Sequence, residues 1–427
     1  MISTERYLIK GGRVFAGNGA RECDLLIEDG KVAKIGAEIA ADGAQVVDAA
    51  GLFVAPGLVD LRCRLREPGF EEKEDIASGT AAAAKGGFTT VCCLPNTDPI
   101  NDNAVVTAFI REKAAREGVV RVHPVAALTK GMKGDELTEA GDLADAGAVA
   151  LSDGTKSVRD ANRMRLALSY AKTFGLTIVS HAEDEDLTNG GLMNEGYWST
   201  ALGLAGATRV AEESVVARDC MLAEIEGAKL HIAHISTAGS AEIVRQAKRR
   251  GVRVTCETAP HYLLATDEWV QTYDTNTKVN PPLRTEADRV ALIEALKDGT
   301  IDCIASDHAP QHIDDKNVEY AIAAPGVSSL ETALSVCWTA LVKPGHLTPE
   351  LLFEKMTAAP AAIFGLDAGL IVEGAVADIV VVDPAAEWTV DPAKFRSKGR
   401  NTPFAGRTLS AVVKYTFVGG RCVHMEK

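Results

Sequence analysis

The chain has 427 residues, 46% of them apolar and 24% charged, which is enough to bury the core of a large globular protein. Its formal net charge of −14 argues against binding to nucleic acid and to anionic membrane surfaces. The nine cysteines form no CxxC pair, and no run of about 18 apolar residues occurs. These features predict a cytoplasmic protein with reduced thiols.

Both ends of the chain have the pattern of antiparallel sheet. The N-terminal part alternates apolar and polar positions and breaks at glycine, as in "YLIKGGRVFAGNG" and "DLLIEDGKVAKIG". The C-terminal part has the same character in "ADIVVVDPAAEWTV" and "LSAVVKYTFVGGRCV". We therefore expect residues 1–55 and 366–427 to form one composite β-sandwich domain.

Between the two ends, short β-rich runs alternate with helical patterns. The helical patterns include "EDIASGTAAAAKG", "DANRMRLALSYAKTFG" and "AEIVRQAKRRG". The expected strands are "LFVAPGLVDLR", "FTTVCCLP", "VVRVHPVAAL", "AVALSD", "LTIVSH", "KLHIAHIS", "VRVTCETAP" and "IDCIASDH". This alternation predicts a (β/α)8 barrel of the TIM type over residues 56–365. A doubly wound open sheet is the alternative, but no GxGxxG follows the first strand.

The stretch "VDLRCRLREPGF" places three arginines at alternating positions directly after an apolar run. Arg62, Arg64 and Arg66 would share one face of an extended strand. Buried like charges are costly unless anions or a cleft lie opposite them. The stretch therefore indicates a charged site at the end of the first barrel strand.

Other strand ends carry metal-ligand side chains. Asp153, His181, His234 and Asp307 end or follow four different expected strands, and barrel active sites lie at the C-terminal ends of the strands. Each residue alone could serve a structural role. Together, two imidazoles and two carboxylates at one mouth predict a divalent-metal site that suits zinc.

Two neighbouring residues are expected to stay outside this cluster. Strand alternation places His231 and His234 on opposite faces, and His234 is nearer the strand end. Lys156 follows Asp153 closely and could be a carbamylated bridging ligand, although a plain loop lysine is the favoured interpretation.

These motifs resemble those of dihydroorotase, of the class I type, in the amidohydrolase superfamily. The resemblance covers essentially the whole chain and begins with "PGLVDLRCRLREPGFEEKEDIASGTAAAAKGGFTT". "LPNT", "SHAED", "AHIST", "KVNPPLR" and "SDHAP" follow in the family's order, and "ADIVVVDP" resembles the return to the small sandwich. The resemblance implies interconversion of dihydroorotate and N-carbamoyl-L-aspartate in de novo pyrimidine biosynthesis.

The resemblance also implies roles for single residues. Asp307 would shuttle the proton, and Gln311 stands where the family usually has a substrate-contacting histidine. The positions that match substrate contacts are Arg66, Asn96, Asn280, Pro325 and Gly326. A small pyrimidine precursor is therefore the implied ligand.

The sequence departs from the family at its metal ligands. The family begins its site with His-x-His, and the matching positions are Arg62 and Arg64. The resemblance implies that the missing pair would hold an α metal together with Asp153 and Asp307. A guanidinium carries no lone pair to offer a metal. Asp153, His181 and His234 would remain as a candidate single β site for zinc.

Three functions stay open from the sequence. Some members of the family are non-catalytic dihydroorotase-like chains that assemble with aspartate carbamoyltransferase, and the loss of the His pair favours this reading, with an oligomer expected. The second is a working cyclic amidohydrolase that uses one metal. The third is an anion sensor that captures a carboxylate with its arginines. If the chain is non-catalytic, we expect Arg62 and Arg64 to neutralise Asp153 and Asp307 by ion pairing.

Overall fold

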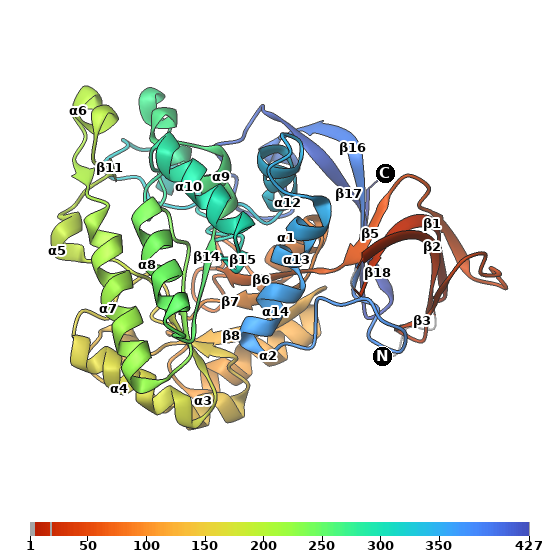
Figure 1. The fold of residues 1–427 in the computed structure, drawn as a ribbon, viewed down its shortest axis with the longest axis horizontal. Helices are drawn as coiled ribbons and strands as arrows, with labels where there is room; N and C mark the ends of the chain where they lie inside the picture. The colour runs from red at the N-terminus through yellow and green to blue at the C-terminus, as the bar shows by residue number, and fades with distance from the viewer. Residues whose placement is uncertain (1–4, 18, 427) are drawn as a thin grey trace.

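The computed structural model describes residues 5–17 and 19–426, as a parallel barrel beside a sheet built from both ends of the chain (Figure 1). Residues 1–4, 18 and 427 of the expected terminal domain lie outside the described residues. The predicted fold class, a (β/α)8 barrel with a strand-rich terminal domain, is confirmed. The domain boundaries at residues 55 and 366 stay a prediction.

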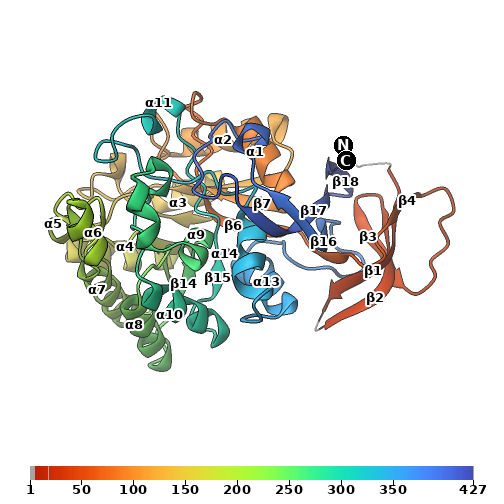
Figure 2. The ribbon, with the colours of Figure 1, turned by 90° about the horizontal axis from the view of Figure 1, so that it is seen from above.

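The terminal sheet has eight strands in the order β18-β17-β16-β5-β1-β2-β3, with β4 paired to β1. Its strands are β1 (Tyr7–Ala16), β2 (Gly19–Glu28), β3 (Lys31–Gly36), β4 (Gln45–Asp48), β5 (Phe53–Pro56), β16 (Ile379–Thr389), β17 (Thr408–Val418) and β18 (Arg421–Met425). Strand β5 pairs with β1 and with β16, and so joins the N-terminal strands to the C-terminal ones. In Figure 2, β16 and β17 lie between the barrel and β1–β4.

The barrel has eight parallel strands in the order β15-β14-β13-β10-β9-β8-β7-β6. They are β6 (Leu58–Cys63), β7 (Phe88–Cys93), β8 (Arg121–Ala126), β9 (Ala150–Leu151), β10 (Thr177–Ser180), β13 (Leu230–Ile232), β14 (Val254–Thr258) and β15 (Cys303–Ile304). The ring closes after β15, where Cys63 bridges to His308 and the amide of Arg64 donates to the His308 carbonyl at 2.9 Å. A separate short pair, β11 (Met193–Asn194) and β12 (Gly206–Ala207), lies in a connecting loop.

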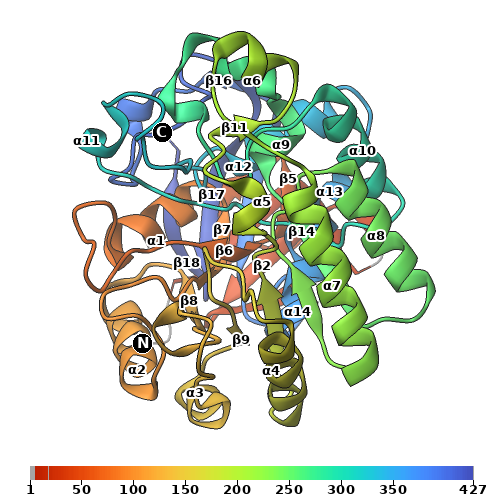
Figure 3. The ribbon, with the colours of Figure 1, turned by 90° about the vertical axis from the view of Figure 1, so that its left-hand side faces the viewer.

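Helices follow the barrel strands and surround them. Figure 3 shows α2, α3, α4, α7 and α8 arranged around the strands. The helices are α1 (Ile76–Lys85), α2 (Ala104–Glu117), α3 (Ala140–Ala146), α4 (Ala161–Thr173), α5 (Glu185–Thr188), α6 (Tyr197–Leu202), α7 (Val210–Glu226), α8 (Ala238–Arg249), α9 (Pro260–Leu264), α10 (Glu286–Lys297), α11 (Ile313–Lys316), α12 (Ala333–Cys337), α13 (Pro349–Met356) and α14 (Ala358–Phe364). In the described part of the chain, no helix combines the length and apolar character that crossing a bilayer requires.

One expected strand is divided between the two sheets. The run "LFVAPGLVDLR" was predicted as a single strand, but β5 belongs to the terminal sheet and β6 to the barrel. Gly57 lies at the junction, where an added Cβ would approach the Thr89 side chain to 2.1 Å. The two sheets can separate at this position because glycine leaves room for β7.

The strand cysteines pack in the core, as the sequence predicted. Cys92, Cys93, Cys256 and Cys303 are buried and unpaired. Cys92 and Cys303 share an interior cluster with Val59 and Val125 inside the barrel. The barrel is therefore filled by side chains, as in other barrels of this type.

Candidate functional site at the mouth of the barrel

Two of the three arginines reach the same carboxylate. Arg62 Nε lies 3.1 Å from Asp307 Oδ1, and Arg64 Nη1 lies 3.6 Å from the same oxygen. All three side chains are buried, and Arg62 is only 1% exposed. Arg62 Nη2 also donates to the Gly154 carbonyl at 2.9 Å. Arg62 at the end of β6 and Arg64 just after it therefore face Asp307 inside the mouth, and Arg62 also reaches the loop after β9.

Asp153 does not follow the predicted pairing with an arginine. It accepts hydrogen bonds from the amides of Leu128 and Thr129 at 2.9 and 2.8 Å, and from Thr129 Oγ1 at 2.5 Å. Burial raises its pKa, and these bonds oppose the rise. The expected pairing of Asp153 is wrong because the loop after β8 supplies three donors to its carboxylate. Lys156 is exposed, which fits a plain loop lysine.

His181 and His234 lie side by side. His181 Nδ1 is 2.8 Å from His234 Nε2, and His181 Nε2 is 2.9 Å from Glu183 Oε2. Burial alone would raise the pKa of Glu183, but its bonds with His181, Asn280 and Thr188 outweigh burial and lower that pKa to about 2. Burial, with the charge of Arg62 adding to it, lowers the pKa of His234. The structure therefore holds the two imidazoles together beside an ionised glutamate.

The predicted substrate-contact residues already have partners within the chain. Arg66 donates to the Pro310 carbonyl through Nε at 3.2 Å and Nη2 at 2.9 Å. Gln311 Nε2 donates to the Pro325 carbonyl at 2.8 Å, and its Oε1 accepts from Lys73 at 3.1 Å. Burial and the nearby Arg64 charge lower the pKa of Arg66 to about 9. The loops that would contact a substrate are thus closed on one another.

The remaining predicted contacts line the edge of this region. Asn280 Nδ2 donates to Glu183 Oε2 at 2.8 Å, and Asn96 is half-buried in the loop after β7. Gly326 has a φ of +134°, and an added Cβ would lie 2.7 Å from Ala309. Only glycine fits this turn between the Gln311 loop and the Lys278 carbonyl, to which the Gly326 amide donates at 2.9 Å.

Backbone strain marks the same region. Arg66, His234 and Asp307 have φ values of 64°, 35° and 46°. Residues other than glycine rarely adopt such values, and they persist where the surrounding structure fixes them, often at functional sites. Three of the predicted site residues share this property, which supports the mouth as the functional site.

Comparisons with known proteins place the chain in a family. A dihydroorotase from Acetivibrio thermocellus is 51% identical over 422 residues, with 98% of this chain and 99% of the relative covered. A dihydroorotase from Geobacter metallireducens is 52% identical over 420 residues, with 98% and 99% covered. The chain belongs to the dihydroorotase family. The family model described as "Dihydro-orotase-like" matches residues 51–240.

Solved structures agree on the fold of this dihydroorotase-family chain. The L-hydantoinase (dihydropyrimidinase) from Arthrobacter aurescens aligns with a TM-score of 0.89 at 27% identity, covering 100% of this chain and 96% of that one. A D-hydantoinase aligns with a TM-score of 0.87 at 25% identity, covering 99% and 96%. The barrel and the terminal sheet are therefore both part of the shared architecture.

The mouth does not fit the pair of metals that the family resemblance implies. Arg62 and Arg64 are pure donors, Asp307 Oδ1 faces both of them, and Asp153 is taken up by Thr129 and Leu128. Over residues 5–17 and 19–426, the group of three His, Cys, Asp or Glu side chains with ligand atoms within 4.8 Å of one another lies elsewhere, at His231, Glu257 and Cys303. The single site of Asp153, His181 and His234 stays a prediction.

Sequence reasoning missed several residues that hold this site. Thr129 fixes Asp153, and Glu183 fixes His181. Asn401, from the C-terminal segment, accepts from the Gln311 amide at 3.0 Å and donates to the Ala309 and Gly326 carbonyls. His261 on α9 was also not predicted, and burial lowers its pKa to about 4. Of these residues, only Glu183 could have been found from the sequence, because it lies two residues after His181.

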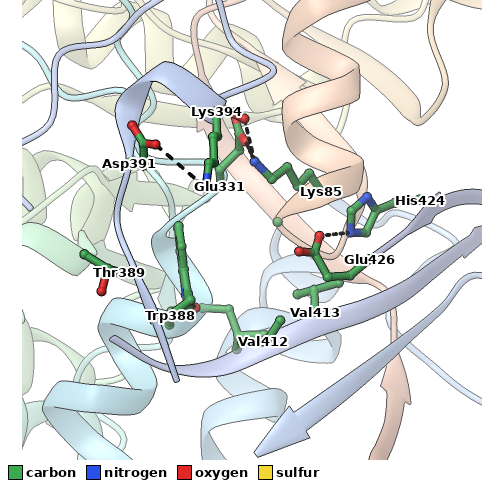
Figure 4. Close-up of a pocket in the computed structure, with 13 residues that line it drawn as sticks. Lys85, Glu331, Trp388, Thr389, Asp391, Lys394, Val412, Val413, His424 and Glu426 are labelled. Atoms are coloured by element: carbon green, nitrogen blue, oxygen red, sulfur yellow. Dashed lines mark hydrogen bonds and ion pairs between the residues drawn. The ribbon is translucent and has the colours of Figure 1, made fainter. Parts of the chain in front are cut away.

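A separate pocket of about 330 Å³ lies between the barrel and the terminal sheet (Figure 4). Its lining includes Lys85 from α1, Glu331, and Trp388 from β16, and the Lys85 amine lies 2.7 Å from the Glu331 carboxylate. None of the predicted site residues is among those that line it. The pocket is therefore distinct from the mouth.

Proposed function

We propose that this chain is a cytoplasmic dihydroorotase homologue of de novo pyrimidine biosynthesis whose hydrolytic activity is impaired. In this proposal it works as a structural partner of aspartate carbamoyltransferase, within a larger oligomer. The relatives named dihydroorotase support the pathway. The arrangement of Arg62, Arg64 and Asp307 supports the loss of activity.

The pairing of Asp307 is the observation that carries the proposal. The resemblance assigns the proton shuttle to this carboxylate. Here Oδ1 faces two buried guanidiniums at 3.1 and 3.6 Å. A general base must come within hydrogen-bond reach of the proton that it accepts. Only Oδ2 is left to accept a proton, and once a proton is taken the two buried guanidiniums lose their counter-charge, which is costly.

The substrate side of the mouth supports the same conclusion. Arg66 and Gln311 bind the carbonyls of Pro310 and Pro325, and Asn280 binds Glu183. A substrate would have to replace each of these internal bonds, so part of its binding energy would be lost in breaking them. A scaffold, by contrast, gains from loops that are already satisfied.

The alternative is an active hydrolase with one metal, interconverting dihydroorotate and N-carbamoyl-L-aspartate. The contact of His181 with His234 at 2.8 Å favours it, because two imidazoles stay together beside Glu183. In this alternative, Asp153 would turn from Thr129 to complete the candidate zinc site. Zinc binding at that site would then depend on both His181 and His234, because they are its other two ligands.

A turnover assay with zinc added separates the two functions. We expect dihydroorotate hydrolysis far below about 1 per second, the lower end of usual enzyme rates. Turnover at or above that rate, abolished in His181→Ala, would establish the alternative. The matched control is His312→Ala, because His312 is exposed and caps the short helix α11.

Co-expression with aspartate carbamoyltransferase tests the scaffold role. We expect a single complex by size exclusion, with a transferase that is less stable or less active when this chain is absent. His181→Ala should assemble as well as the natural chain, because the scaffold role does not use that imidazole. Two separately eluting, fully active proteins would contradict the partnership.

A further inference from the structure

A second polar cluster lies inside the barrel, away from the arginines at the mouth. It consists of His231 on β13, Glu257 on β14 and Cys303 on β15, and their ligand atoms all lie within 4.8 Å of one another. The three strands are neighbours, and Glu257 is paired directly with Cys303 in the sheet. Each of these residues is at most 1% exposed. The His231 ring also lies 6.0 Å from the Phe364 ring of α14.

Hydrogen bonding orients the His231 ring. Its Nδ1 is 2.9 Å from Thr255 Oγ1, and the Thr255 hydroxyl donates to the Leu230 carbonyl at 3.5 Å. In the neutral tautomer in which the Thr255 hydroxyl accepts from Nδ1–H, that hydroxyl can still donate its own proton to the Leu230 carbonyl. The lone pair is then on Nε2. A metal-binding imidazole is commonly held in this way by a partner on its other nitrogen.

That lone pair faces an unsatisfied carboxylate. His231 Nε2 lies 3.2 Å from Glu257 Oε2. The two atoms do not have hydrogen-bond geometry, and neither Glu257 oxygen has a hydrogen-bond donor in the described part of the chain. Two acceptors this close in a buried site repel each other unless a cation lies between or beside them.

The third side chain decides which cation fits. A proton on His231 would satisfy the imidazole and the carboxylate and would leave Cys303 as a core residue only, whereas a metal would also use its sulfur. Nitrogen, oxygen and sulfur donors together are typical of zinc sites in proteins. We propose that His231, Glu257 and Cys303 bind one zinc-class divalent cation in the interior of the barrel. Binding releases the thiol proton to solvent and forms a metal–thiolate bond.

This inner site is independent of the function proposed for the mouth. Its ligands come from β13, β14 and β15 and include a thiol, whereas the candidate ligands at the mouth are imidazoles and carboxylates. Because the inner ligands are buried, we expect the metal to enter as the barrel folds and to resist chelators in the native protein.

Cobalt provides a probe specific to the thiolate. We would refold the full chain with Co²⁺ and record the thiolate-to-cobalt charge-transfer band in the near ultraviolet. The band is expected in the natural chain and in His181→Ala, and is expected to disappear in Cys303→Ala. The matched control is Cys92→Ala, because Cys92 is buried in the same interior cluster but is not a proposed ligand.

Metal analysis of the zinc-loaded chain completes the test. One zinc per chain, the stoichiometry of a single site, should survive dialysis against chelator and be lost in Glu257→Gln. If Cys303→Ala does not fold, the Glu257→Gln variant and the natural chain still decide the question. The proposal is overturned if the natural chain shows no charge-transfer band and keeps no zinc. It is also overturned if its zinc is lost in His181→Ala and kept in Glu257→Gln.

Discussion

The mouth and the interior of the barrel distribute their charge in opposite ways. At the mouth, Arg62 and Arg64 bring two cations to one carboxylate, Asp307. In the interior, His231 Nε2 lies 3.2 Å from Glu257 Oε2, and neither Glu257 oxygen has a hydrogen-bond donor among the described residues. Both regions are buried, so neither imbalance is screened by water. A metal therefore has less reason to bind where the family resemblance implies it and more reason to bind deeper in the barrel.

The family resemblance implies that Arg62 and Arg64 stand where two histidines would bind a metal. Histidine offers a lone pair to a metal, and arginine in its place offers only donors and a fixed positive charge. The buried Arg62 side chain supplies positive charge beside Asp307, but it cannot activate water as a bound metal would. Asp307 keeps a partner, so the mouth can stay folded without a metal.

Exchanging the arginines for histidines should give the largest change. In Arg62→His/Arg64→His we expect zinc at the mouth, because two lone pairs replace two fixed cations beside Asp307. The readout is zinc per chain after mild chelation, and the gained zinc should disappear when His181→Ala is added. A folded variant that gains no zinc would mean that something other than the arginines excludes the metal.

Loss of the closer arginine should destabilise the protein most. Arg62→Met should lower the free energy of unfolding by about 3 kcal/mol, because breaking a buried ion pair exposes the remaining charge to an apolar site. Urea unfolding measures the change. The matched control is Arg159→Met, which breaks an exposed pair with Asp186 and should cost about 0.5 kcal/mol or less.

The bond that holds Asp153 should contribute less. Thr129→Val keeps the shape of the side chain and removes the hydroxyl that donates to Asp153 Oδ2 at 2.5 Å. We expect a loss of about 2 kcal/mol, typical of a buried hydrogen bond to a charged group. A loss below 0.5 kcal/mol by urea unfolding, the size of a neutral surface change, would show that Asp153 has other support.

Arg64 should show the smallest effect of the mouth residues. It lies 3.6 Å from Asp307, and Arg62 still pairs with that carboxylate when Arg64 is removed. Burial lowers the pKa of Arg64, Asp307 opposes that shift, and the Arg62 charge adds to it, so removing Arg64 loses an attraction but also relieves a repulsion. We expect Arg64→Met to cost about 1 kcal/mol, less than the roughly 3 kcal/mol of a broken buried pair, because Asp307 keeps its nearer partner. A cost equal to that of Arg62→Met would remove the distinction between the two arginines.

The barrel could be predicted because its signals are local. Strand runs ending in Asp153, His181 and Asp307 each carry their own pattern, and parallel strands bring such ends to one mouth. The division of β5 from β6 could not be predicted, because it depends on the pairing of β5 with β16, which is distant in the sequence.

The partners within the site were harder to predict for the same reason. Thr129 reaches Asp153 from the preceding loop, and Asn401 reaches Gln311 from the far end of the chain. Strand alternation correctly gave Arg62 and Arg64 a common target, but it was wrong for Arg66, which lies beyond the end of β6 and binds the Pro310 carbonyl. Strand alternation cannot predict the direction of a side chain beyond the end of a strand. His234 is such a residue, because it follows β13 and has a φ of 35°.

A double-mutant cycle on Arg62 and Asp307 tests most directly whether the arginine supplies the charge at the mouth. The free energy of unfolding is measured for the natural chain, Arg62→Met, Asp307→Asn and the double variant. We expect the double variant to recover much of the loss, with a coupling energy of about 2 kcal/mol or more, within the range for residues in contact. A coupling energy below about 0.5 kcal/mol would contradict the account, because the arginine would then not be neutralising Asp307.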